Sequence, residues 1–299
     1  MKWFFAVNEA APNFGPIAQM IKVAVYSARE NTTLVPHILY DGHENALTEW
    51  LQDRGVTVVP CKSILHVQLG EIAARGGHPQ AQTVGGGAFL RTQIPRLAAE
   101  LKIEDDFVFY SDCDVIFLRE VVPELSALRP RYFSVAPEGD PQDWTRINTG
   151  AMLMNLPALR RRDAHFFRFM RRHLDELTRA SWDQTAYEWF YNPLLRRLLG
   201  AGIRPALAER IYRALQRRGL RVPLGWQPLP ASFNWKPYWG EYSRAHMIHF
   251  HGAKPHERAL MKDGQTPENL RHLQASARGA YFELCDLWDK LLAKADSAR

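Results

Sequence analysis

Cysteine and long apolar runs are both scarce in this 299-residue sequence. Its three cysteines, Cys61, Cys113 and Cys285, stand far apart and lack metal-ligand spacing, which argues against a disulfide scaffold or a zinc-held fold. No apolar run reaches the length of about 18 residues that a membrane span needs. The apolar start of the chain ends at Asn8, too early for a signal peptide. These absences predict a globular protein in a reducing, cytoplasmic setting.

Lysine is missing from residues 160–221, a segment with 15 arginines and six acids. Its net charge of +9 leaves −3 for the rest of the chain. Such a segment suits a solvated basic face, an acidic acceptor, or anionic lipid headgroups at the inner face of a membrane. Within it, residues 206–219 predict an amphipathic helix closed by Gly219, with an apolar side made of Leu207, Ile211, Ala214 and Leu215.

The first 120 residues alternate strand-like and helix-like segments, which is typical of βαβ units and a largely parallel sheet. The expected strands are residues 3–7, 34–40, 56–59 and 107–111, and the expected helices are residues 16–29, 44–54 and 88–102. Residues 62–87 lack a clear period and hold Gly76-Gly77 and Gly85-Gly86-Gly87, which predicts a mobile loop. Later strands are expected at 132–136, 151–156 and 247–250, and later helices at 159–179 and 281–295. With no internal repeat or clean linker, the pattern predicts one α/β domain with a helical C-terminal portion.

Two carboxylates follow the apolar strand expected at residues 107–111. Residues 107–111 lead directly into Asp112-Cys113-Asp114. Alternate residues of an extended chain point the same way, so Asp112 and Asp114 face one point while Cys113 turns away. Two hard oxygen ligands suit Mg²⁺ or Mn²⁺. Because ligands of open α/β sheets bind beyond the carboxyl ends of the strands, Asn8, Asp41 and Asp112 predict one shared cleft.

Five further segments accompany the aspartate pair: Arg91, Asn148-Thr149-Gly150, Asp183-Gln184, Asn234 and His249-Phe250-His251-Gly252-Ala253-Lys254-Pro255. In this set and order the chain resembles glycosyltransferase family 8 and its bacterial relatives, retaining GT-A enzymes that include glycogenin and lipooligosaccharide galactosyltransferases. The resemblance implies a Rossmann-like, three-layer α/β/α fold with a mainly parallel central sheet. Residues 1–260 would form the GT-A domain, including the basic helical segment 196–221. Residues 261–299 would form a helical C-terminal extension packed on the same domain.

The resemblance also implies roles for single residues. Mn²⁺ or Mg²⁺ would be held by Asp112, Asp114 and His249. His251 is a rival ligand, because the histidine loop is one residue shorter than the family pattern. The residues that match nucleotide-sugar contacts are Val7, Asn8, Arg91, Asp112, Asn148, Gly150, Gly252 and Lys254. Asp183 and Gln184 match the catalytic pair near the anomeric carbon, while Asn234 and Trp235 line the acceptor site or simply pack a loop.

The implied activity is a metal-dependent, retaining transfer of a hexose, glucose or galactose, from a UDP-sugar to a hydroxyl of a glycan or glycolipid. Retention can proceed through a covalent intermediate, which needs a carboxylate behind the anomeric carbon, or by front-face attack. An amide cannot ionise, so Gln184 favours front-face attack with Asp183 as an anchor for sugar hydroxyls. The expected partners are donor, acceptor and peripheral contact with an anionic membrane, and no nucleic acid.

Two other functions fit parts of the sequence. Asp112-Cys113-Asp114-Val115 resembles the opening of haloacid-dehalogenase phosphatases, in which the first aspartate is the nucleophile and a later acidic pair binds Mg²⁺. Asp286 and Asp289 offer such a pair, but several strands precede the motif here. A non-enzymatic binder of membrane or nucleic acid would explain the arginine-rich segment alone, because phosphate attraction needs charge and not a metal pocket.

Overall fold

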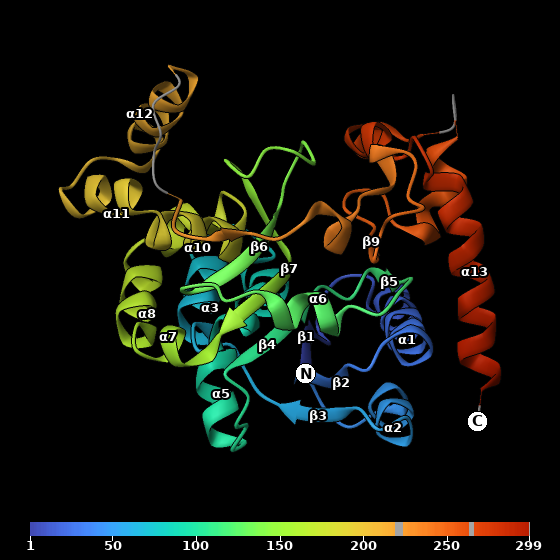
Figure 1. The fold of residues 1–299 in the computed structure, drawn as a ribbon. Helices are drawn as coiled ribbons and strands as arrows, with labels where there is room; N and C mark the ends of the chain where they lie inside the picture. The colour runs from blue at the N-terminus through green and yellow to red at the C-terminus, as the bar shows by residue number, and fades with distance from the viewer. Residues whose placement is uncertain (219–223, 263–265, 299) are drawn as a thin grey trace.

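The computed structural model describes residues 1–218, 224–262 and 266–298, and a seven-stranded sheet forms its centre (Figure 1). In spatial order the strands are β3 (Thr57–Pro60), β2 (Val35–Asp41), β1 (Lys2–Asn8), β4 (Phe107–Ser111), β7 (Ile147–Asn155), β6 (Phe133–Pro137) and β8 (Gln227–Pro228). The pairs from β3 to β4 are parallel, whereas β7 runs antiparallel to both neighbours and β8 parallel to β6. The predicted α/β fold with a mainly parallel sheet is confirmed.

Helices cover both faces of this sheet. One face carries α1 (Phe14–Asn31), α2 (Ala46–Asp53) and α6 (Val122–Ala127). The other carries α3 (His66–Ala74), α4 (Gly86–Leu90), α5 (Ile94–Glu100), α7 (Leu156–Arg160), α8 (Asp163–Arg172), α9 (Leu174–Thr178) and α10 (Trp182–Tyr191). The helices α11 (Pro193–Gly200) and α12 (Pro205–Arg217) extend beyond α10 at one end of this layer (Figure 1).

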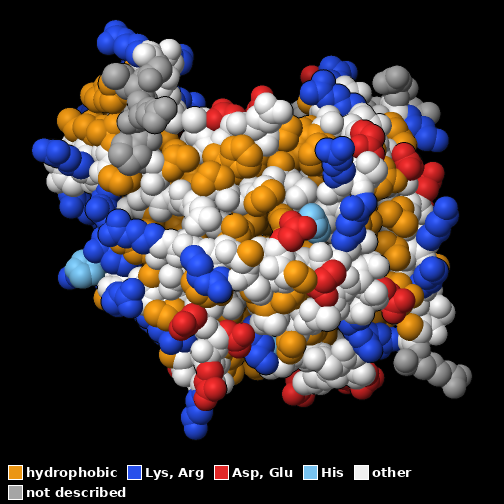
Figure 2. Space-filling model, viewed as in Figure 1, with side chains coloured by type: hydrophobic (Ala, Val, Ile, Leu, Met, Phe, Trp, Pro, Cys, Tyr) orange, Lys and Arg blue, Asp and Glu red, His pale blue; other side chains and the backbone are white. Residues whose placement is uncertain are grey.

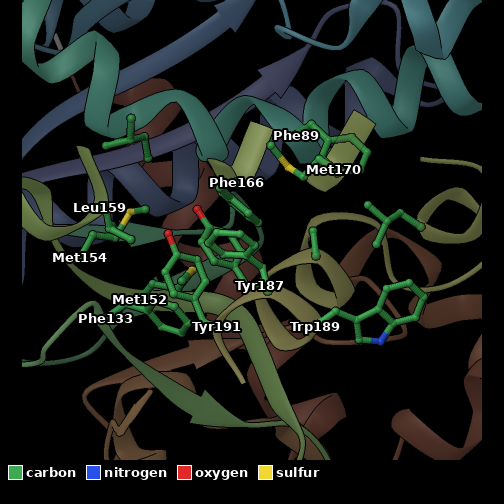
Figure 3. Close-up of a cluster of buried hydrophobic side chains, with 14 of the residues drawn as sticks. Phe89, Phe133, Met152, Met154, Leu159, Phe166, Met170, Tyr187, Trp189 and Tyr191 are labelled. Atoms are coloured by element: carbon green, nitrogen blue, oxygen red, sulfur yellow. The ribbon is translucent and has the colours of Figure 1, made fainter. Parts of the chain in front are cut away.

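The side chains of β1 show why two helical layers form. Trp3, Phe5 and Val7 are buried against α1 and α2, whereas Phe4 is buried against the opposite layer. Because successive strand residues point to opposite faces, a fully apolar strand demands cover on both sides. In the second layer, Phe166 and Tyr187 meet the sheet residue Met152 in an aromatic-rich cluster (Figure 3).

A small second sheet joins distant parts of the chain. Strand β5 (Val115–Phe117) pairs antiparallel with β9 (Met247–His249), and the register sets Val115 opposite His249. The C-terminal helix α13 (Tyr281–Ser297) packs against α1 through a third apolar cluster. Short helices connect these parts: η3 (Ala231–Asn234), η4 (Pro237–Trp239), η5 (Pro255–Met261) and η6 (Glu268–Ser276).

The prediction of a mobile loop over residues 62–87 is wrong. The segment contains α3 and the π-helix η1 (Ala81–Gly85), and Leu65, Leu69 and Ile72 are buried at helical spacing. Gly85 and Gly86 serve close packing, whereas Gly76 allows a turn with φ of +77°. A Cβ on Gly85 would lie 2.6 Å from the Trp182 ring, so only glycine allows this contact.

Two predicted helices are interrupted. Residues 88–102 divide into α4, the short helix η2 (Arg91–Gln93) and α5, which has Pro95 in its first turn. Proline lacks the amide donor that a continuous helix would need there. Residues 159–179 divide into α7, α8 and α9, and α8 gives way to α9 at His173, where φ is −109°. Both breaks redirect apolar side chains toward the core.

The prediction of which residues form the buried side of the helix at 206–219 is wrong in part. Leu207 is 48% exposed, while Ala208 and Tyr212 are the buried residues of α12. The aromatic ring of Tyr212 anchors the helix, so its buried face is rotated from the one that the leucines suggested. The expected closing residue, Gly219, and the end of the basic segment 196–221 lie outside the described residues.

Candidate functional site

The aspartate pair lies where β4 ends and the chain crosses to β5. The Asp112 amide donates to the Gly150 carbonyl of β7 (3.0 Å), and the Phe250 amide donates to the Asp114 carbonyl (2.9 Å). The Cys113 thiol turns away and donates to the Ala6 carbonyl. Pairing of β5 with β9 brings in His249, so that one ligand atom each from Asp112, Asp114 and His249 lie within 4.8 Å of one another. Within the described residues this is the one such cluster of three or more histidine, cysteine or acidic side chains.

A chain of hydrogen bonds fixes the orientation of the His249 ring. Its Nδ1 donates to Asn234 Oδ1 (2.8 Å), the Asn234 amide donates to Asn148 Oδ1 (2.7 Å), and the Asn148 amide donates to Glu138 Oε2 (2.8 Å). We call these four residues the Glu138–His249 relay. A carboxylate only accepts, so Glu138 sets the direction of every bond in the relay. The backbone amide of Gly150 donates to Asn148 Oδ1 as well, which fixes the same amide orientation independently.

The relay determines what His249 Nε2 can do. This atom lies 3.3 Å from Asp114 Oδ1 and 3.8 Å from Asp112 Oδ2. With Nδ1 donating to Asn234, Nε2 faces the two carboxylates across a space that a shared cation would fill. The donor set of two carboxylates and one oriented imidazole therefore fits a divalent metal ion. Gly150 makes room for the ring, since a Cβ there would lie 2.4 Å from it.

Arg91 links the metal-facing carboxylate to a second acid. Its guanidinium, 7% exposed, lies 2.8 Å from Asp112 Oδ1 and 3.0 Å from Asp183 Oδ2, the latter without hydrogen-bond geometry. It also donates to the Thr149 carbonyl (2.6 Å) and stacks on the Tyr110 ring. Burial alone would lower the pKa of Arg91, but Asp112 and Asp183 outweigh burial and raise it. For Asp183, burial raises the pKa to about 6, against the opposing effect of Arg91.

Asp183 and Gln184 start α10 and face the same network. Trp182 precedes them with φ of +49°, a left-handed conformation that is uncommon for a large side chain and turns the chain into the helix. Asp183 Oδ2 accepts from the Thr149 hydroxyl (3.3 Å). Gln184 Oε1 accepts from the Thr149 amide (3.3 Å) and the Asn148 side chain (3.4 Å). Both side chains are thereby held against the start of β7.

Lys254 supplies the positive charge closest to Asp114. Its Nζ contacts Asp114 Oδ2 and donates to the Phe250 carbonyl. Burial opposes ionisation of Asp114, but Lys254 and His249 hold the pKa of Asp114 well below its usual range. Asp114 is therefore an anion and available as a metal ligand at neutral pH.

Two neighbouring hollows open beside these charges. The first, about 500 Å³, is lined by Val7, Asn8, Arg91, Asp112, Asp114 and Lys254 among others. The second, about 450 Å³, shares Asn8 and includes Asp41 and Lys62. Asn8 joins the two strand ends, because its side chain donates to Asp41 Oδ2 (3.2 Å). The strand ends at Asn8, Asp41 and Asp112 thus border two adjacent hollows that share Asn8 as a lining residue.

Other residues singled out in the sequence lie outside these two hollows, which we call the cleft. His251 lies apart from the aspartates: its Nε2 is 3.2 Å from Glu138 Oε1 and its Nδ1 meets the Tyr238 hydroxyl. Asn234 is fully buried inside the relay, and Trp235 bridges to Ile248 beside it. Gly252 has φ of +95°, a backbone conformation that favours glycine, and a Cβ there would lie 2.3 Å from the Ser276 hydroxyl oxygen.

Sequence reasoning missed Glu138, Thr149 as a hydrogen-bonding side chain, Tyr110 and Tyr238. Glu138 follows β6 without any spacing to the other motifs, so only the pairing of β6 with β7 reveals it. The acidic pair of the phosphatase alternative is engaged elsewhere: Asp286 and Asp289 both pair with Arg258. Among the described helices, none has the length and apolar character to cross a membrane.

Comparison with known proteins identifies the fold. No family model and no curated protein sequence matches the chain. Among solved structures, the galactosyltransferase LgtC with donor and acceptor sugar analogues aligns with a TM-score of 0.56 at 14% identity, over 100% of this chain and 98% of LgtC. The glycosyltransferase GlyE of Streptococcus pneumoniae TIGR4 aligns with a TM-score of 0.54 at 13% identity, over 98% of this chain. The bifunctional glycosyltransferase WbbM aligns with a TM-score of 0.50 at 11% identity, also over 98% of this chain.

These similarities confirm the predicted GT-A fold, a three-layer α/β/α arrangement found in glycosyltransferases. The chain spans 63% of the length of GlyE and 51% of WbbM. At identities this low, the alignments establish the fold, and the chemistry has to be argued from the side chains.

Proposed function

We propose that this chain is a metal-dependent, retaining glycosyltransferase that moves a hexose, glucose or galactose, from a UDP-sugar to a hydroxyl of a glycan or glycolipid. The observation that carries the proposal is the group Asp112, Asp114 and His249, with Lys254 beside it, at the carboxyl ends of the strands in a GT-A fold. Ligands of open α/β sheets bind at this edge.

Asp112, Asp114 and His249 would hold the metal ion. When bound, a divalent cation supplies Lewis-acid stabilisation to the departing diphosphate. An imidazole ligand favours Mn²⁺ over Mg²⁺, because Mg²⁺ prefers a shell of oxygen atoms alone.

The cleft has a region suited to each part of the donor. Lys254 lines this cleft and offers a positive charge for the diphosphate. Val7 and Asn8 line the hollow at the end of β1, where we place the uridine. Asn148 and Gly150 lie at the start of β7, on the side of Gln184, where we place the sugar.

Front-face attack is the mechanism that the contacts of Asp183 and Gln184 favour. Arg91 and Thr149 engage the Asp183 carboxylate, and Thr149 and Asn148 engage the Gln184 oxygen, so neither side chain is free to act as a nucleophile. The bond between the anomeric carbon and the diphosphate oxygen breaks while the acceptor oxygen bonds to the same face of that carbon. The acceptor proton passes to the departing diphosphate. Asp183 and Gln184 would orient the sugar and exclude water.

The arginine-rich segment suggests where a lipid-linked acceptor is presented. Exposed arginines follow one another on α8, α11 and α12, namely Arg168, Arg171, Arg172, Arg196, Arg197, Arg204, Arg210 and Arg213. Figure 2 shows basic side chains gathered on the side where Figure 1 places these helices. We propose that this face contacts anionic lipid headgroups, with the exposed Leu207 at its surface.

A panel of UDP-sugars tests the proposed function. We expect slow hydrolysis of UDP-glucose or UDP-galactose that requires Mn²⁺. Asp114→Asn should reduce Mn²⁺ affinity by more than about 100-fold. Loss of a residue that only orients a metal ligand already costs about 10- to 100-fold, and Asp114 would bind the metal directly. The matched control Asp175→Asn removes a surface carboxylate that pairs with Arg75. UDP-sugar binding that is equally tight in the presence of a chelator would contradict the metal assignment.

A further inference from the structure

We propose that a second cavity, formed by α10, α11, α12 and the segment that leads into β7, binds a neutral saccharide unit of the acceptor. The cavity measures about 390 Å³, and its lining includes Arg146, Glu188, Tyr212 and Trp226. It shares no lining residue with the donor cleft described above. The proposal rests on the proposed glycosyltransferase function, because that function requires an acceptor.

The position of Glu188 ties this cavity to the catalytic pair. Glu188 follows Gln184 by four residues in α10, so both side chains lie on the same face of the helix, about 6 Å apart along its axis. Glu188 Oε1 accepts from the Ile147 amide (3.1 Å), and the next residue, Asn148, donates to Gln184. The cavity therefore begins one helical turn from Gln184, the residue that we place beside the donor sugar. An acceptor glycan bound there would extend its next units toward this cavity.

The cavity presents polar groups that lack partners within the described chain. Tyr212 is 5% exposed, and its hydroxyl lies near the amides of Asn192 and Gln216 without meeting hydrogen-bond geometry. Buried hydroxyls in folded proteins are normally hydrogen-bonded, so this group is suited to a ligand hydroxyl. Glu188 has a second carboxylate oxygen beyond the one bonded to Ile147. Burial raises the pKa of Glu188 to about 7, so near neutral pH its carboxyl group both donates and accepts.

The charges around the cavity specify a neutral ligand. Three arginines, Arg146, Arg213 and Arg217, stand against three acids, Asp143, Glu188 and Glu209, and the partial protonation of Glu188 near neutral pH leaves these charges close to balance. Glu209 is already bonded to Arg213 (3.0 Å) and to the Trp189 indole (2.9 Å). Leu195 and Trp226 add apolar surface. Planar polar side chains beside an apolar wall recognise the hydroxyls and ring face of a sugar, whereas balanced charge offers no net attraction to an anion.

Saccharide titrations of the full chain test this assignment. Lactose, cellobiose and maltotriose serve as neutral probes, with saturation-transfer NMR to detect binding and titration to measure Kd. We expect at least one probe to bind, and Tyr212→Phe and Glu188→Gln each to weaken it about three- to tenfold, the effect of losing one hydrogen bond. Glutamine still accepts from the Ile147 amide, so Glu188→Gln preserves the fold. Tyr26→Phe and Glu71→Gln, which make the same atomic changes elsewhere, should leave binding unchanged.

Three results would overturn the inference: no neutral probe binds, the Tyr212 and Glu188 variants bind like the unchanged protein, or only the anionic probes galacturonic acid and glucose 6-phosphate bind. Mn²⁺-dependent hydrolysis of UDP-sugar, measured on the same variants, separates this inference from the proposed function. If UDP-sugar is hydrolysed but saccharide binding is unaltered in Tyr212→Phe and Glu188→Gln, the saccharide site is refuted and the proposed function is not. Saccharide binding that depends on Tyr212, without any hydrolysis, would defeat the proposed function and leave the saccharide site standing.

Discussion

The metal-facing end of the cleft and the cavity at α12 differ in how their polar groups are satisfied. Around Asp112 and His249, nearly every donor and acceptor has a partner, and the Glu138–His249 relay fixes the direction of each bond. Around Tyr212 and Glu188, a hydroxyl and a carboxylate oxygen have no hydrogen-bond partner among the described residues. The first region is organised before any ligand arrives, as metal coordination requires. The second leaves hydrogen bonds for a ligand to complete.

The largest expected effect comes from removing the charge at the centre of the organised region. Arg91→Met leaves the buried Asp183 beside the half-buried Asp112 without the guanidinium between them, which should lower the free energy of unfolding by about 3 kcal/mol. Chemical denaturation measures this loss. Arg96→Met is the control in the neighbouring helix: its ion pair with Asp163 is exposed, so about 0–1 kcal/mol should be lost. If both variants lose the same free energy of unfolding, the ion pairs of Arg91 stabilise the protein no more than the exposed pair of Arg96 does.

The relay is tested next through Asn234. Asn234→Ala frees the His249 ring and should weaken Mn²⁺ binding about 10- to 100-fold, as measured by calorimetry. Asn234→Asp retains an acceptor for His249 Nδ1 but loses the donor to Asn148 Oδ1, so it should recover only part of the affinity. In the metal-free protein, ¹⁵N NMR should show that the ring proton of His249 is on Nδ1. In Asn234→Ala, which lacks the acceptor for this proton, the proton should no longer be confined to Nδ1. An unprotonated Nδ1 in the unchanged protein would refute the relay.

Glu188 provides a pH test of the other region. Because burial raises the folded-state pKa of this acid to about 7, its contribution to stability is complete below the unfolded value near 4.5 and is lost as the pH rises through about 7. Acidification from about pH 8 to about pH 5.5 should therefore stabilise the protein by about 1–2 kcal/mol relative to Glu188→Gln. Thermal unfolding across this range measures the difference. Parallel pH profiles for the two proteins would show that the carboxyl group is not buried as described.

The smallest expected effect concerns the surface beyond the cavity. Arg210→Gln on α12 should weaken sedimentation with phosphatidylserine vesicles about fivefold, the contribution of one arginine near an anionic surface. Lys290→Gln on α13, at the opposite side of the molecule, is the matched control (Figure 1). Sedimentation that is independent of phosphatidylserine content would exclude this face as a membrane contact.

The strands and the aspartate pair were predicted because both depend on local patterns. A continuous apolar run and the carboxylates at its end are visible within a few residues, as Phe107 to Asp114 illustrates, whereas the role of His249 was implied only by the family resemblance. The relay could not be predicted, because Asn148 and Asn234 are 86 residues apart and meet only through the pairing of β5 with β9 and β4 with β7. Gly85 and Gly86 misled for a related reason: their purpose is close contact with Trp182 and Asn8, partners that no local pattern reveals.

The direction of the Glu138–His249 relay has a consequence for acidity. Only its two ends carry ionisable groups, and the amides between them cannot change their protonation state. Burial opposes ionisation of Glu138, but its hydrogen bond with His251 and the charge of Lys236 lower its pKa to about 2. The terminal acceptor therefore stays negative throughout the physiological range and would lose its charge only as the pH falls toward 2. Two uncharged amides thus carry the direction of the hydrogen bonds from Glu138 to the His249 ring, and the orientation of that ring is a fixed property of the fold as long as Glu138 stays negative.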